Sequence, residues 1–338
     1  MARRSIVRVT EDPQDAGAWY RLGNAREDEG RDAEALACFE RAVAIDPGHA
    51  RAWNNLGAAS QRLGDLRRAE SAYRTARSRD PALLQSHLNL GRLHESRGDY
   101  ARAAACYRAA LTHHPDDGML AHLLAAASGE NTPRAPRQYV QALFDEQARG
   151  FDAHLVQELE YRIPEVLADL VRPALTRRPA QVLDLGCGTG LVGAALAAEG
   201  IELTGVDLSA DMLHQAQKRG IYVRLIQADV LEGLAQCAGT SLAAVVAADM
   251  FIYVGELDEL FAEASRALVQ GGVFAFSIEA LESGSYRLQP TGRYAHALDY
   301  VRALAGNCGL SVERIADARI RRQGQGYATG SVVLMRKA

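Results

Sequence analysis

An internal repeat of 34 residues constrains the first third of this chain more than any other feature. Residues 34 apart keep the same character in three successive copies, beginning with Gly23, Gly57 and Gly91. The same register relates further columns: Trp19, Trp53 and His87; Leu22, Leu56 and Leu90; Ala35, Ala69 and Ala103; Phe39, Tyr73 and Tyr107; Pro47, Pro81 and Pro115. This period and order predict paired helices that stack and bury their apolar faces against neighbouring copies.

These columns resemble the tetratricopeptide repeat, so we expect an all-α solenoid over residues 1–128, with three repeats and a capping helix at 118–128. The resemblance implies a groove that binds a peptide or a protein partner, lined by Tyr20, Asn24, Asn54, Asn55, Gln85, Asn89 and Arg92. Asn24 and Asn55 fall where related repeats clamp a C-terminal carboxylate, but the basic partners of such a clamp do not match here. The alternative is that the repeats serve only as a scaffold or a homodimer surface.

A connection between two domains is predicted after the repeats. Residues 129–136 contain two prolines and no periodic pattern, and 338 residues are more than one domain usually holds. Helical spacing returns over 138–148 and 151–159, where the pair Phe-Asp occurs at 144–145 and again at 151–152. We expect residues 129–166 to form a linker with connector helices, which either join the domains or cover an active site.

From residue 180 onward, short apolar runs alternate with helical segments. Strands are predicted at 181–185, 202–207, 222–227, 242–248 and 272–278, with helices between them. Two more, at 311–320 and 327–335, are joined by a turn predicted at 321–326. Such alternation indicates a parallel sheet with helical crossovers, which binds its ligand beyond the carboxyl ends of the strands.

The turn after the first of these strands has a glycine at every second position, in Asp184-Leu-Gly-Cys-Gly-Thr-Gly190. Glycine permits sharp turns and lets a ligand approach the main chain closely. Gly188, Gly190 and Gly193 also satisfy the G-x-G-x-x-G string of dinucleotide-binding proteins. Because of this match, an NAD(P)-linked oxidoreductase is kept as an alternative. Against it, the string would begin three residues beyond the strand and would leave Asp184 unexplained.

The D-x-G-x-G-x-G form resembles motif I of class I S-adenosylmethionine-dependent methyltransferases. The resemblance covers roughly 167–336 and implies, for a domain at 167–338, a Rossmann-like α/β fold with a seven-stranded mixed sheet that ends in an antiparallel hairpin. Asp184 and the glycines would seat the methionine part, Asp207 the ribose and Asp229 the adenine, although Asp207 taken alone equally fits a helix cap. The implied cofactor is S-adenosylmethionine, and its expected binding residues are Asp184, Gly186, Cys187, Gly188, Gly190, Asp207, Leu208, Met212, Asp229, Val230, Asp249 and Tyr139.

Candidate catalytic residues follow from the same resemblance. Asp249 ends the fourth strand, where acceptor-side residues lie in that family, and Tyr253 follows it. His296, with Tyr294 beside it, is expected in a loop after the fifth strand, on the ligand side of the sheet, and histidine is the commonest general base for a phenol or an alcohol. The alternative is that His296 is an ordinary surface histidine. His154 in the linker is a weaker candidate.

As a whole the chain resembles bacterial methyltransferases that contain tetratricopeptide repeats. We therefore expect methyl transfer to an oxygen or nitrogen acceptor, with the repeats recognising a peptide or protein. Two alternatives stay open: a small-molecule methyltransferase whose repeats dimerise, and a non-catalytic adaptor that retains a relic cofactor domain.

Composition limits the partners and the location. With 38 Lys and Arg against 42 Asp and Glu, the net charge is −4, so no overall positive field gathers nucleic acid or anionic membrane. The five cysteines are scattered without C-x-x-C spacing, so we expect neither a disulfide framework nor a bound metal. No window approaches the ~18 continuous apolar residues of a membrane span, and the start of the chain lacks the apolar stretch of a secretory signal. A cytoplasmic location is expected.

Overall fold

The chain forms two compact units, Met1–Gly129 and Glu130–Ala338. The computed structural model describes residues 9–338 except 149–150, 154, 156–158, 177 and 324–325. His154 therefore lies outside the described residues. Within the described part, no helix is both long and apolar enough to cross a membrane.

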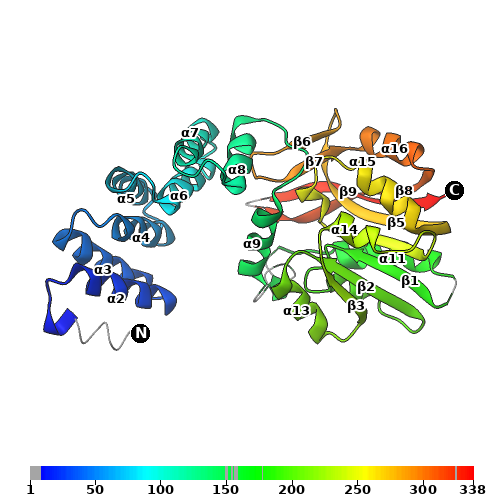
Figure 1. Ribbon diagram of the computed structural model, residues 1–338, viewed down its shortest axis with the longest axis horizontal. Coiled ribbons are helices and arrows are strands. Elements are labelled where there is room, and N and C mark those ends of the chain that lie inside the picture. Colours follow the sequence, from blue (N-terminus) through cyan, green and yellow to red (C-terminus); the bar gives the residue numbers. More distant parts are fainter. Residues whose placement is uncertain (1–8, 149–150, 154, 156–158, 177, 324–325) are drawn as a thin grey trace. The chain divides into compact units, whose positions relative to one another are not determined.

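The first unit is built from antiparallel helix pairs (Figure 1). Each pair corresponds to one copy of the 34-residue repeat, which confirms the predicted helical solenoid. The pairs are α2 (Ala16–Asp28) with α3 (Asp32–Ile45), α4 (Ala50–Arg62) with α5 (Leu66–Arg79), and α6 (Leu84–Glu95) with α7 (Tyr100–Leu111); α8 (Gly118–Ser128) packs on α7. The turn inside each pair contains a glycine with positive φ, at Gly30, Gly64 and Gly98. These turns suit glycine because other residues rarely adopt that backbone conformation.

One close contact recurs in every repeat and explains the alternation of glycine and aromatic columns. A Cβ placed on Gly57 would lie 2.6 Å from the ring of Tyr73, and Gly23 and Gly91 face Phe39 and Tyr107 in the same way. The aromatic ring of the second helix thus lies directly against the backbone of the first. Only glycine leaves room for this packing.

Replacing Gly57 by alanine is expected to lower the free energy of unfolding of the repeats by about 1–3 kcal/mol, because overpacking forces the Tyr73 ring or the helix to move. Both tryptophans of the chain, Trp19 and Trp53, lie in the repeats, so urea titration followed by tryptophan fluorescence measures this unit. The double variant Gly57→Ala/Tyr73→Leu should lose less stability than the sum of the two single changes. Strict additivity would show that the ring contact is not the cause.

The second unit is organised around a nine-stranded sheet in the order β3-β2-β1-β4-β5-β7-β6, with β9 paired to β5 and β8 to β9. The parallel strands are β1 (Ala180–Leu185), β2 (Ile201–Asp207), β3 (Tyr222–Gln227), β4 (Leu242–Ala247) and β5 (Leu268–Leu281). The long strands β8 (Leu310–Gln323) and β9 (Gly326–Lys337) form an antiparallel hairpin beside β5. The predicted α/β fold, mixed sheet and C-terminal hairpin are confirmed.

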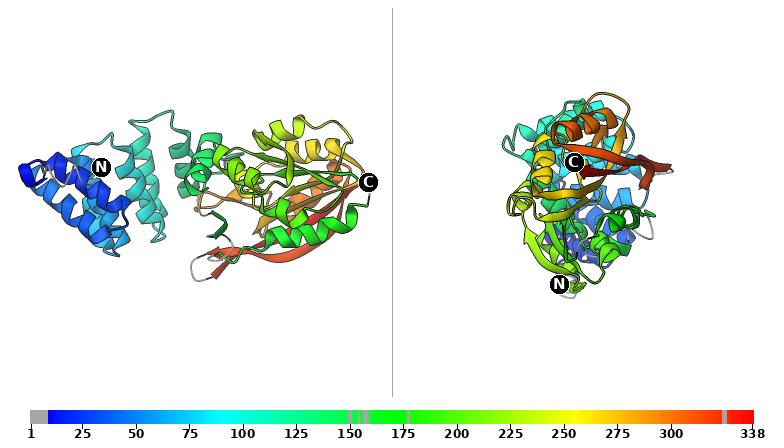
Figure 2. Two further views of the ribbon diagram at one scale, coloured as in Figure 1. Left: turned by 90° about the horizontal axis from the view of Figure 1, so that it is seen from below. Right: turned by 90° about the vertical axis from the view of Figure 1, so that its right-hand side faces the viewer.

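Helices lie on both faces of this sheet (Figure 2). Each face has its own apolar core because neighbouring residues of a strand point to opposite sides, as Val182 and Leu183 do. The helices are α11 (Ile163–Val171), α12 (Leu191–Leu196), α13 (Ala210–Lys218), α14 (Val230–Ala235), α15 (Asp258–Ala267) and α16 (Leu298–Asn307). Before them come α9 (Arg137–Gln147) and the single turn α10 (Phe151–Ala153); two 3-10 turns, η2 (Arg172–Ala174) and η3 (Phe251–Tyr253), complete the set.

Two short strands enlarge the sheet beyond the seven that were expected. They are β6 (Tyr286–Leu288) and β7 (Tyr294–Ala297). The 14-residue strand β5 extends past its neighbours, and its last residues pair in parallel with β7 over 279–281 and 295–297. The prediction that Tyr294 and His296 lie in a loop is therefore wrong, because this extension of β5 offers them a strand to pair with.

Candidate functional site

A cavity of about 260 Å³ lies at the carboxyl ends of the central strands. Its volume is near the lower end of the range for small-molecule sites. The lining comes mainly from the loops after β1, β2, β3 and β4 and from α9, α10 and η3. Further residues come from α11, α12, α15, β8 and the turn before β7. This is the position at which open α/β sheets bind ligands.

The glycine motif forms one wall of the cavity. Gly186, Gly188 and Gly190 all have positive φ, so the chain turns sharply between β1 and α12. A Cβ on Gly188 would meet no atom within 4 Å, whereas a Cβ on Gly193 would lie 2.3 Å from the hydroxyl oxygen of Tyr222. One side of the loop is thus open, and the other side is packed against the tyrosine ring.

Asp184 lies behind this loop rather than in the cavity lining. Its side chain is 1% exposed, and its Oδ2 accepts a hydrogen bond from the Tyr222 hydroxyl at 2.7 Å. Burial raises the pKa of Asp184 to about 7. Its Oδ1 has no hydrogen-bond partner among the described residues. Asp184 therefore supports the glycine loop from inside the domain.

Asp207 joins the end of β2 to the glycine loop. Its Oδ2 accepts a hydrogen bond from the Gly188 backbone N–H at 2.8 Å, and its Oδ1 accepts one from the Ser209 N–H at 2.9 Å. The residue is 8% exposed and lines the cavity, and burial raises its pKa. The helix cap that Asp207 could have supplied is made by Ser209, whose Oγ accepts from the Met212 N–H.

Asp229 also lines the cavity while it caps a helix. Its side chain accepts a hydrogen bond from the Leu231 N–H at 3.0 Å, and Glu232 closes a capping box with the Asp229 N–H. Of the residues predicted to bind the cofactor, the cavity lining contains Gly186, Cys187, Gly188, Asp207, Leu208, Asp229, Val230 and Asp249. Asp184, Gly190, Met212 and Tyr139 lie outside that lining, and Met212 is fully buried.

A buried charge cluster closes the cavity at the end of β4. Asp249 has a φ of 52°, and its Oδ2 lies 2.6 Å from Nη1 of Arg321. Arg321 also pairs with Glu279 of β5, and its side chain is only 4% exposed. Arg321 was not predicted as a site residue, because residues 321–326 were expected to form a turn, whereas β8 continues through Arg321.

The three predicted catalytic residues occupy different environments. Tyr253 lines the cavity, its ring stands edge-on to Phe144 at 5.4 Å, and burial raises its pKa to about 12. His296 and Tyr294 are buried in β7 and do not contribute to the lining. His296 Nε2–H donates to the carbonyl oxygens of Val254 and Gly255, and burial lowers the pKa of His296 to about 4. Tyr294 shares a hydrogen bond with Thr132. Both residues therefore lie outside this lining, and their catalytic role stays a prediction.

The two Phe-Asp pairs of α9 and α10 turn toward the glycine motif. Phe144 and Phe151 line the cavity, and their rings are 6.0 Å apart. Asp145 accepts a hydrogen bond from the Ser209 hydroxyl at 2.5 Å. Asp152 accepts one from the Thr189 hydroxyl and pairs with Arg219 of the segment after α13. The apolar member of each pair thus covers the cavity while the acidic member attaches to its wall.

The segment just before α9 is attached to the opposite side of the cavity. The Pro133 carbonyl oxygen accepts hydrogen bonds from the N–H groups of Gly255 and Glu256, and the Ala135 N–H donates to the Tyr253 carbonyl. The Asn131 side chain bonds the backbone on both ends of β6, at Tyr286 and Leu288. Residues 131–135, which were predicted to connect the domains, are therefore hydrogen-bonded into the second unit.

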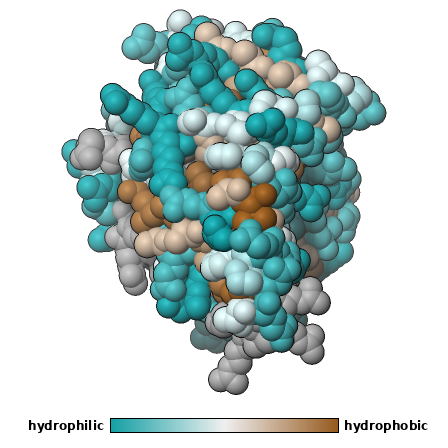
Figure 3. Space-filling model, turned by 90° about the vertical axis from the view of Figure 1, so that its left-hand side faces the viewer, coloured by the Kyte–Doolittle hydropathy of each residue, from teal (hydrophilic) through white to brown (hydrophobic). Residues whose placement is uncertain are grey.

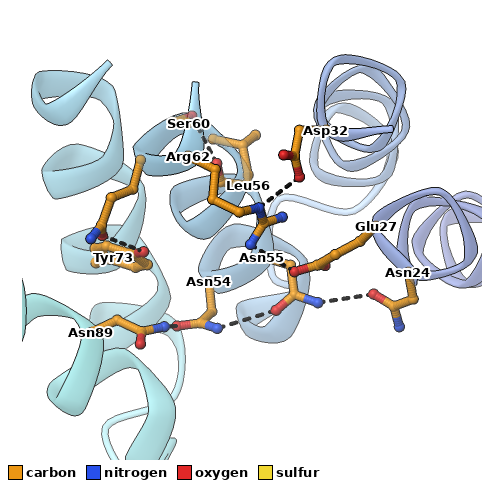
Figure 4. Close-up of polar contacts among 11 residues, drawn as sticks. Asn24, Glu27, Asp32, Asn54, Asn55, Leu56, Ser60, Arg62, Tyr73 and Asn89 are labelled. Carbon is orange, nitrogen blue, oxygen red and sulfur yellow. Dashed lines mark hydrogen bonds and ion pairs between the residues drawn. The ribbon is translucent and has the colours of Figure 1, made fainter. Parts of the chain in front are cut away.

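In the repeats, four predicted groove residues form one continuous chain of amides (Figure 4). Asn89 Nδ2 donates to Asn54 Oδ1, Asn54 Nδ2 to Asn55 Oδ1, and Asn55 Nδ2 to Asn24 Oδ1, over 2.9–3.1 Å. The chain runs across the first helices of all three repeats. Each amide has two N–H groups and an oxygen with two lone pairs, so the row does not use all of its hydrogen-bonding groups, although Asn54 is buried.

The other predicted groove residues differ in exposure. Gln85 and Arg92 are exposed, whereas Tyr20 is half-buried and packs on Phe39 and His49. The large apolar side chains that the described repeats expose are Leu63, Leu66 and Tyr100. The face drawn in Figure 3 is mostly hydrophilic, with apolar side chains gathered near its middle and a paler group along its upper edge.

Parts of both units match known protein families. Residues 182–272 match the methyltransferase domain family, and residues 16–49 and 54–118 match tetratricopeptide repeat families. Human methyltransferase-like protein 27 is 46% identical over 85 residues, which cover 24% of this chain and 34% of that protein. The malonyl-[acyl-carrier protein] O-methyltransferase of Enterobacter lignolyticus is 33% identical over 151 residues, 45% of this chain and 57% of that protein.

The chain thus spans between a third and just over half of the length of these two relatives. Among solved structures, the magnesium protoporphyrin IX methyltransferase of Synechocystis, with bound SAM, is similar at 18% identity and a TM-score of 0.41. That match covers 52% of this chain and 78% of the other.

Proposed function

Since this chain joins tetratricopeptide repeats to a class I methyltransferase domain with S-adenosylmethionine as its cofactor, we propose that it transfers a methyl group to an oxygen or nitrogen acceptor. The observation that carries the proposal is the position of Asp207. Its buried carboxylate holds the open glycine loop by the Gly188 N–H and lies at the edge of a cavity at the ends of the strands.

The residues around the cavity fit the cofactor in charge and shape. Gly188 leaves free space where a side chain would intrude, and Asp207 and Asp229 offer carboxylate oxygens at the ends of adjacent strands. We assign Asp207 to the ribose hydroxyls, Asp229 to the adenine amine, and the loop 186–188 to the methionine part. S-Adenosylmethionine, when bound, supplies an electrophilic methyl group.

On the acceptor side, the protein's task is to orient the nucleophile and to exclude water. Phe144 and Tyr253 make that part of the cavity apolar, and the Asp249–Arg321 pair fixes the end of β4 beside them. Because the pKa of Tyr253 is about 12, its phenol is protonated at neutral pH and acts as a hydrogen-bond donor rather than as a base. We therefore propose that Tyr253 positions the acceptor and that His296 takes no part in the reaction.

Helices α9 and α10 act as a cover over the cofactor in this proposal. The supporting contacts are those of Asp145 with Ser209 and of Asp152 with Thr189 and Arg219, which hold Phe144 and Phe151 over the cavity. A closed cover would exclude water from the reacting groups.

The variant Asp152→Asn should release S-adenosylhomocysteine about tenfold faster than the wild-type protein, because an amide weakens the charged contact to Arg219, and a charged hydrogen bond contributes ~1.5–3 kcal/mol. Stopped-flow displacement measures the rate. Asp169→Asn is the matched control, since Asp169 pairs with Arg172 on the exposed surface. Equal release rates for all three proteins would rule out a cover held by Asp152.

The repeats recognise a peptide or protein in this proposal, through the row of asparagines from Asn24 to Asn89. A recognition unit fused to a catalytic unit raises the local concentration of the substrate. Deleting residues 1–129 should lower kcat/KM on the natural acceptor while cofactor binding, measured on the same truncated protein, is retained. Unchanged kcat/KM would favour the alternative in which the repeats serve dimerisation.

Isothermal titration of the full chain with S-adenosylmethionine, S-adenosylhomocysteine and NAD tests the cofactor assignment. Micromolar binding of the first two without NAD is the expected result. Binding of NAD alone would favour an oxidoreductase, and binding of none would favour the non-catalytic adaptor.

A further inference from the structure

Four arginines line the cavity, and three of them have carboxylate partners. Arg321 pairs with Asp249 and Glu279, Arg137 with Glu232, and Arg134 with Glu259. Arg293 has no ion pair with any residue that the structure describes, although it is half-buried. A guanidinium that is partly removed from water without a counter-charge is unfavourable, so an anion at this place would be stabilised.

The backbone holds Arg293 in a defined position. It ends the turn between β6 and β7, where the Gln289 N–H donates to the Arg293 carbonyl at 2.7 Å and the Gly292 N–H donates to the Gln289 carbonyl at 2.9 Å. The next residue, Tyr294, is fully buried in β7. The side chain therefore leaves a rigid turn.

A second donor lies in the same cavity. Tyr253 lines the cavity together with Arg293 and carries a phenol hydroxyl. The Tyr253 hydroxyl has no hydrogen-bond partner within the described part of the chain. The Asp249–Arg321 pair and Glu256, which is exposed, are also part of the lining.

The surrounding wall is apolar. Phe144, Ile252 and Leu260 contribute to it, and the first two adjoin Tyr253 by ring contact and by sequence. A ligand that fits here has an apolar body and one anionic end. A carboxylate matches the planar guanidinium because both groups can form two parallel hydrogen bonds.

We propose that the acceptor carries a carboxylate next to an apolar body, and that Arg293 and Tyr253 bind this carboxylate while Phe144, Ile252 and Leu260 pack on the body. The inference rests on the proposed methyltransferase function and specifies its substrate class. The carboxylate serves recognition, since an ion-paired carboxylate is a weak nucleophile. It belongs either to a free acid or to the C-terminus of a peptide.

The test compares acids with their neutral amides on the full chain saturated with S-adenosylhomocysteine. The probes are 4-phenylbutyrate against 4-phenylbutanamide, and N-acetyl-Ala-Ala-Phe-Leu with a free against an amidated C-terminus. Calorimetry should show at least one acid binding about tenfold more tightly than its amide. Preference in the first pair identifies a free acid, and preference in the second identifies a peptide terminus.

Two variants connect this preference to the assigned side chain. Arg293→Gln should abolish the preference for the acid, whereas Arg302→Gln, which removes an exposed arginine of α16 that pairs with Asp299, should retain it. Equal or undetectable binding of acids and amides by the wild-type protein, or an unchanged preference in Arg293→Gln, would overturn the proposal. Binding of S-adenosylhomocysteine is measured first, so its absence would instead count against the proposed function.

Discussion

Replacing Asp207 by alanine is expected to raise the Kd for S-adenosylmethionine about 100-fold. The carboxylate accepts hydrogen bonds from the N–H groups of Gly188 and Ser209, and we assign it the ribose hydroxyls as well. A hydrogen bond to a charged group contributes ~1.5–3 kcal/mol, and ~2.8 kcal/mol corresponds to a factor of about 100 in Kd. Calorimetric titration measures the change directly.

Asp211→Ala is the matched control for this substitution. Asp211 lies four residues further on, in the first turn of α13, and is exposed. The Asp211→Ala variant should bind the cofactor with the same Kd as the wild-type protein. Asp207→Asn keeps the volume but replaces an acceptor oxygen by an N–H donor that faces a backbone N–H, so its Kd should also rise. An unchanged Kd in Asp207→Ala would refute the assignment of Asp207 to the cofactor.

Replacing Arg321 by methionine is expected to destabilise the second unit by about 3–5 kcal/mol. The substitution leaves Asp249 and Glu279 without a counter-charge, and removing one partner of a buried ion pair has costs of this size. Hydrogen exchange of β5 and β9, followed by mass spectrometry, measures the loss in the second unit. Tryptophan fluorescence reports the repeats and should be unchanged, since both tryptophans lie there.

A variant that removes all three charges separates electrostatics from packing. Arg321→Met/Asp249→Asn/Glu279→Gln should recover most of the lost protection, because no unpaired charge is then buried. Asparagine suits position 249, where φ is 52° and few other residues are tolerated. If the triple variant is as unstable as Arg321→Met, shape rather than charge maintains this end of the cavity.

The repeats and the glycine motif could be predicted because their signals are local or periodic. The Gly57–Tyr73 contact recurs every 34 residues, so three copies reveal what one copy would not. Asp184 and Asp207 lie at the carboxyl ends of β1 and β2, and Asp229 follows β3; parallel strands bring these ends to one edge of the sheet. The positions of these three residues relative to the predicted strands were therefore enough to predict that they lie at the same edge of the sheet.

Arg321, Arg293 and the contacts of Asp152 could not be predicted in this way. Arg321 lies in a run with Arg319 and Arg322, which has the composition of an exposed turn, and its burial depends on carboxylates 42 and 72 residues earlier. The role of Tyr222 beneath the glycine loop likewise depends on β3 lying two strands away. His296 was expected in a loop because the pairing of β7 with the end of β5 leaves no pattern in the residues around it.

Residues 131–135 follow the repeats and are hydrogen-bonded to η3, to β6 and to Gly255 and Glu256. Evolution should therefore conserve the length of this junction. An insertion or deletion within it would displace Tyr253, whose carbonyl oxygen accepts a hydrogen bond from the Ala135 N–H. Gly129 and Glu130 are exposed and carry no such contact to the second unit among the described residues. Homologous chains that gain or lose whole repeats should therefore vary in length at these two residues and keep the following five intact.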